Sequence, residues 1–278
     1  MDVYEKQYNE YAKEKATYYY YGKFEPQTSW GFRNLLRENL IIDLIRELYE
    51  SNNQLNILDL GCASGHTALK IAELFPKSKV VGFDIAKAFI EFAKSMSSQK
   101  RITNVDFRVV NAHNWNEKEK YDLIIGAEII EHVDSASEFL KSVFQALKPG
   151  GQLILTTPCL NGDGTIWGRL MRLLRIRKFI PATNFTNEDI SEHGDQHVRE
   201  YSVKLLLADI EKSGFEAKIL VGQIYFDGPF WDKLNNKLLL FKPYQLILSS
   251  LESKMSKLFK IKRTTFSKQL IAMVSRNE

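Results

Sequence analysis

The chain is poor in the features that mark disulfide-bonded, secreted or membrane-spanning proteins. It has only two cysteines, Cys62 and Cys159, too few for a disulfide framework, and neither has an activating partner nearby in sequence. No apolar run approaches the roughly 18 residues that a membrane-spanning helix needs. The polar start Met1–Lys6 does not read as a signal peptide. We therefore expect buried, inert thiols and a cytoplasmic protein.

Internal repeats, low-complexity segments and a strong charge of one sign are also absent from the sequence. The net charge is only +4, and 44% hydrophobic with 26% charged residues is ordinary for a globular chain with a sizeable core. The basic excess lies in residues 160–278, which hold 19 Lys and Arg against 13 Asp and Glu. A solvated face explains this modest excess, and an anionic substrate or membrane surface is the alternative.

The most informative segment present is Asn56–Gly65, where a short apolar run ends in an acidic, glycine-bearing turn before a helical pattern. Glycine lets the backbone approach a ligand closely, and the following helix start offers unpaired N–H groups. A second apolar run, Val80–Phe83, ends in Asp84, 25 positions after Asp59. An acid at the end of a second strand can bind both ribose hydroxyls, although either acid alone reads as readily as a helix cap. The spacing favours a nucleoside site.

The turn lacks the G-x-G-x-x-G pattern of a dinucleotide site. It reads Gly61-Cys62-Ala63-Ser64-Gly65, with Asp59 two positions ahead of the first glycine. A carboxylate here repels phosphate and attracts an ammonium group, which suits a ligand with an amino acid end. The pattern D-x-G-x-x-x-G, with Asp84 and the later Leu147–Gly151, resembles the class I S-adenosylmethionine-dependent methyltransferases. The resemblance covers residues 35 to 221, in round terms, and the last strand.

Short apolar runs alternate with helical segments, which predicts an α/β fold with a doubly wound parallel sheet. Strands are expected at Asn56–Leu60, Lys79–Phe83, Val105–Val109, Tyr121–Ala127, Gln152–Thr156, Phe215–Val221 and Gln269–Val274. Helices are expected at about Arg33–Glu50, Thr67–Phe75, Ala86–Ser97, Ala136–Leu147 and Val203–Lys212. The resemblance implies a seven-stranded, mainly parallel, Rossmann-like sheet whose last strand is antiparallel and inserts beside the fifth.

The segments outside this alternation divide the chain further. We expect residues 1–34 to form an aromatic-rich N-terminal cap and residues 35–278 to form the methyltransferase domain that the resemblance implies, with helical lid insertions at about 157–201 and 222–265. Such insertions usually build substrate pockets.

Each insertion carries a readable pattern. Residues 247–259 place apolar side chains at helical spacing, which predicts a lid helix packed on the domain. Residues 169–179 are basic and apolar together, which leaves peripheral membrane or anionic-lipid contact as an alternative, although the basic positions spread around the helical wheel.

The resemblance implies S-adenosylmethionine as the cofactor and assigns its binding residues. The glycine turn would frame the methionine portion, Asp84 would bind the ribose hydroxyls, and Ile85 would pack on the adenine. Asn111 stands where the family usually has an acid beside the adenine amine, and an amide oxygen also accepts a hydrogen bond. Ala63 and Ser64 are a second departure from the family pattern. The expected cofactor-binding set is Asp59, Gly61, Cys62, Gly65, Asp84, Ile85, Asn111, Ala112 and Glu128.

Directly after the fourth predicted strand the chain reads Glu128-Ile129-Ile130-Glu131-His132, at the carboxyl edge of the sheet. A helical turn would bring Glu128, Glu131 and His132 together. This E-x-x-E-H arrangement is similar to that of the ubiquinone-biosynthesis O-methyltransferases, whose corresponding residues are associated with a divalent cation. The resemblance implies Mg²⁺ or Zn²⁺ on these three residues, polarising a phenolic or catechol oxygen. The alternative is that they cap the next helix and shape the pocket.

The candidate catalytic residues are Glu131, His132 and His197. Methyl transfer depends mostly on positioning and desolvation, but a hydroxyl acceptor is protonated at neutral pH and benefits from a base. Relatives often have a histidine near the position of His197 at the active-site mouth, and a surface histidine at a helix start is the alternative for it. His66 and His113 are expected to pack or hydrogen-bond near the cofactor.

Three functions remain open. The leading hypothesis is a methyltransferase that acts on a hydroxyl oxygen of a small molecule: phenolic, quinol, sugar or natural product. A nucleic-acid methyltransferase is the second, but no Asn/Asp-Pro-Pro-Tyr-type segment follows the fourth strand and no basic stripe is interleaved with aromatics, so we expect no nucleic-acid partner. The third is a cofactor-binding regulator without transfer activity.

Overall fold

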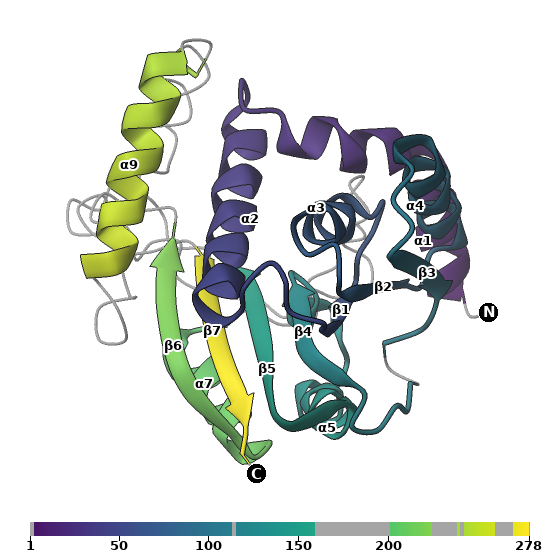
Figure 1. The fold of residues 1–278 in the computed structure, drawn as a ribbon, viewed down its shortest axis with the longest axis vertical. Coiled ribbons are helices and arrows are strands. Elements are labelled where there is room, and N and C mark those ends of the chain that lie inside the picture. The colour runs from purple at the N-terminus through teal and green to yellow at the C-terminus, as the bar shows by residue number, and fades with distance from the viewer. Residues whose placement is uncertain are drawn as a thin grey trace.

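A twisted sheet forms the centre of the computed structural model, which describes residues 3–112, 115–158, 201–223, 238–239, 242–258 and 269–277 (Figure 1). Its seven strands are ordered β3-β2-β1-β4-β5-β7-β6. They are β1 (Asn56–Leu60), β2 (Lys79–Asp84), β3 (Val105–Val109), β4 (Tyr121–Ala127), β5 (Leu147–Pro158), β6 (Phe215–Gln223) and β7 (Gln269–Arg276). Neighbouring strands are parallel except at β7, which is antiparallel to both β5 and β6. The predicted fold class and the place of the last strand are confirmed.

Helices cover both faces of the sheet. They are α1 (Val3–Tyr20), α2 (Ser29–Leu48), α3 (His66–Leu74), α4 (Lys87–Lys100), α5 (Ala136–Ala146), α7 (Val203–Lys212) and α9 (Lys242–Leu258), with short 3-10 turns η1 (Gly22–Phe24) and η2 (Ile130–His132). Alternate residues of β1 face opposite sides, so Ile57 joins the core under α2, α3 and α4, whereas Leu58 joins the core under α5 and α7. This double covering explains why the central strands read as continuous apolar runs.

Two element boundaries differ from the sequence-based prediction for identifiable reasons. Helix α2 begins at Ser29, earlier than predicted, because the Thr28 side chain accepts a hydrogen bond from the Gly31 amide at 3.0 Å and caps it. Strand β5 begins at Leu147, where a helix end was expected, because Leu147 pairs with Tyr121 before the register shifts. The predicted helix and strand therefore meet without a loop.

The N-terminal segment forms a helix that lies across α4 and the start of α3 (Figure 1). The buried small residues Ala12 and Ala16 of α1 pack against Ala86 and Phe89 at the start of α4. The α4 helix begins with help from α1, since the Asn9 side chain accepts a hydrogen bond from the Ala88 amide at 3.0 Å. The N-terminal segment is thus anchored to α4, the helix that follows β2.

Helix α9 lies within the second of the expected insertions. It stands beside α2 and the end of β6 (Figure 1), and its Tyr244 joins a small core with Phe32 and Leu36 of α2. Leu246 and Ile247 of the same helix are exposed. The basic segment 169–179 lies outside the described residues. Among the residues that are described, no helix is both long and apolar enough to cross a membrane.

Candidate cofactor and acceptor site

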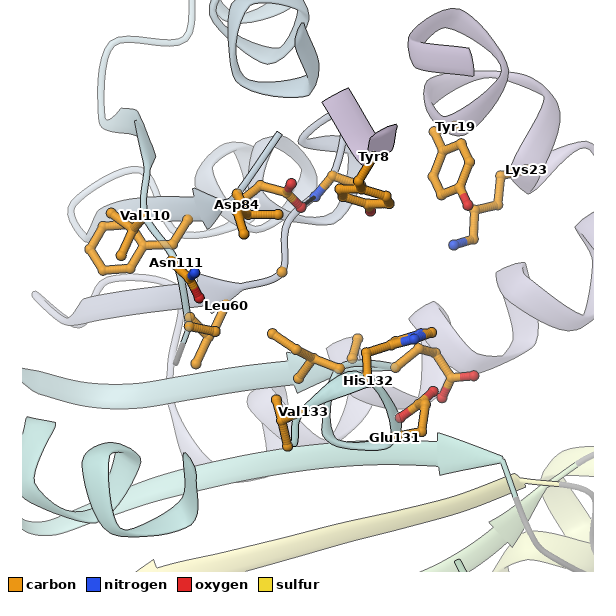
Figure 2. Close-up of a pocket in the computed structure, with 18 of the residues that line it drawn as sticks. Tyr8, Tyr19, Lys23, Leu60, Asp84, Val110, Asn111, Glu131, His132 and Val133 are labelled. Carbon is orange, nitrogen blue, oxygen red and sulfur yellow. Dashed lines mark hydrogen bonds between the residues drawn. The ribbon is translucent and has the colours of Figure 1, made fainter. Parts of the chain in front are cut away.

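A cavity of about 410 Å³ opens at the carboxyl ends of β1, β2 and β4. Figure 2 shows its two ends: Val110 and Asn111 lie on one side, and Glu131 and His132 lie on the other. Between them Asp84 contributes the end of β2, and α1 and η1 cover the opening from above. The cavity has the size and mixed polarity of a small-molecule site.

The glycine turn between β1 and α3 forms one wall. Gly61 and Gly65 both have positive φ, +81° and +79°, and a side chain at Gly65 would come within 2.8 Å of Ala93 and Phe107. The turn is tied to β2 because the Gly61 and Cys62 amides both donate to the Phe83 carbonyl, at 2.8 and 2.9 Å. Two glycines are therefore required for the backbone to fold back over the neighbouring strand.

Asp84 joins the turn to the start of α4. Its carboxylate accepts a hydrogen bond from the Ala63 amide and another from the Ala86 amide, both at 2.9 Å. The side chain is 6% exposed, and burial raises its pKa to about 6 despite these bonds and the charge of Lys23. Asp84 therefore caps a helix and lines the cavity at once, and its remaining lone pairs are available to two ligand donors.

Three of the residues expected around the cofactor do not line the cavity: Asp59, Cys62 and Gly65. Asp59 is 2% exposed, and one of its carboxyl oxygens has no hydrogen-bond partner among the described residues. Burial, followed by the charges of Asp84 and Glu38, raises its pKa to about 7. Burial also raises the pKa of the Cys62 thiol, which disfavours the reactive thiolate form.

Replacement of Asp59 by asparagine is expected to stabilise the protein more at pH 8 than at pH 5. The Asp59 pKa rises from 3.8 to about 7 on folding, so its contribution is most favourable at low pH and is lost as the pH rises toward 7. Asparagine is neutral throughout and should gain on the order of 3 kcal/mol at pH 8. Urea unfolding of both proteins at the two pH values measures this. If the two proteins differed in free energy of unfolding by the same amount at both pH values, ionisation of buried Asp59 would not be the cause of the difference.

At the other end, Glu128 is held in a strained conformation. Its φ of +56° is uncommon for a residue with a side chain. Its amide donates to the Thr156 carbonyl at 3.1 Å, and the Thr156 hydroxyl donates to its carboxylate at 2.9 Å. The other carboxylate oxygen lies 3.3 Å from Nη1 of Arg37 on α2. Strand β5 and helix α2 together therefore fix this carboxylate at the cavity wall.

Glu131 is the most unusual side chain in the cavity. It is 1% exposed, lines the cavity, and neither carboxyl oxygen has a well-formed hydrogen bond to the described residues. Burial first, then the negative charge of Glu128, raises its pKa well above the usual range, and the nearby Thr157 and Arg37 offset this only in part. A buried carboxyl group aimed at a cavity is suited to exchange a proton with a ligand.

Comparison with known proteins decides the family. A family model described as "Methyltransferase domain" matches residues 51–213. The chain belongs to this methyltransferase family. With the sheet topology, this establishes a class I S-adenosylmethionine-dependent methyltransferase fold, as the sequence predicted.

Individual relatives of this methyltransferase are more distant. It is 33% identical over 153 residues to the ubiquinone biosynthesis O-methyltransferase of Bartonella tribocorum, covering 53% of this chain and 60% of the relative. It is 27% identical over 117 residues to the malonyl-[acyl-carrier protein] O-methyltransferase of Bacillus cereus, covering 42% of each. The chain thus spans about half the length of the curated relatives it matches.

Solved structures share the fold at low identity. The [4+2]-cyclase SpnF aligns with a TM-score of 0.58 at 16% identity, covering 91% of this chain and 85% of that one. An S-adenosylmethionine-dependent methyltransferase from Aquifex aeolicus aligns with a TM-score of 0.56 at 10% identity, covering 95% and 98%. These likenesses establish the fold alone, and the chemistry has to be argued from the site.

The methyltransferase cavity brings together many of the predicted residues. Its wall includes Gly61, Asp84, Ile85, Asn111, Ala112, Glu128, Glu131 and His132. The hydrogen bond of His66 to Glu38 at 2.7 Å and its stacking on Phe24 agree with the expected packing role. His113, His197 and Cys159 lie outside the described residues.

The predicted divalent cation is not supported. Within the described ranges, no three or more His, Cys, Asp or Glu side chains are grouped so as to hold a metal ion. The reason lies in α2: the Arg37 guanidinium already supplies a positive charge to Glu128, and η2 does not gather Glu128, Glu131 and His132 into a ligand set.

Sequence reasoning missed the residues that the N-terminal segment contributes. Tyr8, Tyr19 and Lys23 from α1 and η1, and Asn34 and Arg37 from α2, all line the cavity (Figure 2 labels the first three). The signal available was the high density of aromatic side chains before residue 34. The sequence does not show which surface those aromatic side chains contact, so they could be assigned to a cap but not to a binding site.

Proposed function

We propose that the protein transfers a methyl group from S-adenosylmethionine to a hydroxyl oxygen of a small-molecule acceptor. The observation that carries the proposal is one cavity with two different ends. Asp84, an acid at the end of β2, lies toward one end, and the buried carboxyl group of Glu131, without a well-formed hydrogen bond to the described residues, lies at the other. A binding protein without chemistry has no need of a buried carboxyl group with a strongly perturbed pKa, whereas a transferase has a use for one.

The residues of the chain fit the cofactor in three places. Asp84 would accept hydrogen bonds from both ribose hydroxyls, and the apolar wall of Ile85 and Val110 would pack on the base. The Arg37 guanidinium, beside Glu128 and near the turn, would bind the carboxylate of the methionine end. When bound, the cofactor supplies a methyl group on a positively charged sulfur.

Glu131 and His132 are the proposed acid–base residues. Glu131 would take the proton of the acceptor hydroxyl as that oxygen bonds to the methyl carbon and the old carbon–sulfur bond breaks onto sulfur. Burial favours the protonated form of Glu131, and a sulfonium charge nearby would lower its pKa and favour the ionised form that acts as a base. His132, which also lines the cavity, is the second candidate base.

Attack by oxygen is favoured by the relatives, since both of those described above are named O-methyltransferases. The buried carboxyl group also fits oxygen, because a hydroxyl must lose a proton when it is methylated. The cavity is small and the N-terminal helices cover its opening, so a compact acceptor such as a phenol, quinol or sugar fits better than a nucleic acid.

Incubation of the purified protein with isotope-labelled S-adenosylmethionine and separate pools of phenolic, quinol, sugar and carboxylic acid compounds tests the proposal. We expect a methyl-sized mass gain in a hydroxyl-bearing pool, and none with the Asp84→Ala variant. Tight binding of S-adenosylhomocysteine without methylation of any pool, nor of cell-extract metabolites, would favour a regulator without transfer activity.

A further inference from the structure

Helix α1 bonds to the cofactor site at two places, Ser64 and Asn111. The Ser64 hydroxyl, in the glycine turn, donates a hydrogen bond to the Ala16 carbonyl at 2.7 Å. The Asn111 amide, which follows β3, donates to the Glu5 carboxylate at 3.0 Å. An aspartate at position 111, the usual residue of the family, would have no proton for the second bond. The departure at position 111 is therefore matched to α1.

The Glu5 contact determines which way the Asn111 amide faces. A side-chain amide has a donor end and an acceptor end, and either can be turned toward a neighbour. An ionised carboxylate only accepts hydrogen bonds, so the donor end of Asn111 must face Glu5. The acceptor oxygen is then directed away from Glu5.

Asn111 lies where the base of a nucleoside would sit. The Val110 amide donates to the Asp84 carbonyl at 2.9 Å, so the segment after β3 lies directly beside the end of β2. Val110, Asn111 and Ala112 all line the cavity there, at the end away from Glu131 (Figure 2). A base on a ribose held by Asp84 therefore meets an apolar wall with one amide in it.

We propose that Glu5 is a positioning residue that orients the Asn111 amide, so that the site presents an acceptor to the base and selects adenine over a 6-oxo purine. The inference rests on the proposed cofactor site. An exocyclic amine donates hydrogen bonds and pairs with an amide oxygen, whereas a 6-oxo group accepts and needs the amide nitrogen. With Glu5 in place, only the first pairing is available.

The test compares S-adenosylhomocysteine with S-inosylhomocysteine by calorimetry. The unmodified protein should prefer the adenosyl compound. In Glu5→Gln the neutral partner can donate or accept, so the Asn111 amide can turn over and the ratio of the two dissociation constants should fall by about tenfold. Glu10→Gln, an exposed acid on the same helix, is the matched control and should leave the ratio unchanged.

A second variant separates orientation from simple support of the helix. When Glu5→Gln is combined with Asn111→Asp, the introduced glutamine can donate to the introduced aspartate, and that aspartate presents an acceptor whichever way it turns. The preference for adenine should return. Loss of affinity for both compounds in equal proportion, with no change in their ratio, would overturn the role of Glu5. Failure of the unmodified protein to bind S-adenosylhomocysteine would instead overturn the proposed function, and this inference with it.

Discussion

Replacement of Asp84 by alanine is expected to weaken binding of S-adenosylhomocysteine by at least about a hundredfold. Two hydrogen bonds from ribose hydroxyls to an ionised, nearly buried carboxylate would be lost together, and bonds to a charged group are the stronger kind. The Ala63 and Ala86 amides would lose their acceptor as well, which loosens the turn. Calorimetry measures the affinity, and circular dichroism checks that the fold is kept. Unchanged binding by a folded variant would refute the ribose assignment.

The Asp84→Asn variant tests the ribose assignment through the pH dependence of binding. The Asp84 pKa lies near 6, so the unmodified protein should lose affinity as the pH falls through that value, approaching tenfold per pH unit below it. Asparagine does not ionise between pH 5 and 8 and should bind weakly with a flatter profile. If the two profiles had the same shape, the pH dependence would come from another group, with Asp59 the first to examine because its pKa is about 7.

The sheet was predictable because the local sequence of each strand indicates its position. β1, β3 and β4 run over the predicted residues, since apolar runs bounded by polar turns leave little choice of boundary. The order of the strands followed from the family pattern, which the glycine turn and Asp84 carry. The N-terminal helix was not predicted, because its apolar face is mostly tyrosine and alanine and gives a weak helical periodicity.

The site was predictable only where the binding residues follow strands. Asp84 is the last residue of β2, and Glu131 lies in η2, four residues after the end of β4, at the edge of the sheet where ligands bind. Arg37 and Lys23 reach the same cavity from helices that are remote in sequence, and no local pattern predicts that contact. The metal prediction failed for the same reason: the charge that partners Glu128 comes from α2, 91 positions earlier. The roles of the predicted binding residues stay predictions.

Replacement of Glu131 by glutamine is expected to lower kcat on a hydroxyl acceptor by roughly a hundredfold to a thousandfold, the range typical of a lost general base. Glutamine has almost the shape of the protonated carboxyl group that burial favours at rest, so the cavity and the fold should be preserved. Binding of S-adenosylhomocysteine should change little, because Glu131 lies at the end of the cavity away from Asn111 (Figure 2). Single-turnover methyl transfer and calorimetry measure the two quantities separately, with Glu91→Gln on the exposed face of α4 as control.

A matched His132→Asn variant decides which residue takes the proton. If Glu131 is the base, the His132 variant keeps most of its turnover, and the Glu131 variant loses activity most severely with acceptors of high hydroxyl pKa, which depend most on a base. An acceptor that is already ionised should be methylated nearly as fast by the Glu131 variant as by the unmodified protein. If instead the His132 variant shows that pattern, the base is the histidine, and the buried carboxyl group shapes the pocket. If the turnover of the Glu131 variant fell by the same factor with every acceptor, proton transfer by Glu131 would be excluded, because only proton removal depends on the acidity of the hydroxyl.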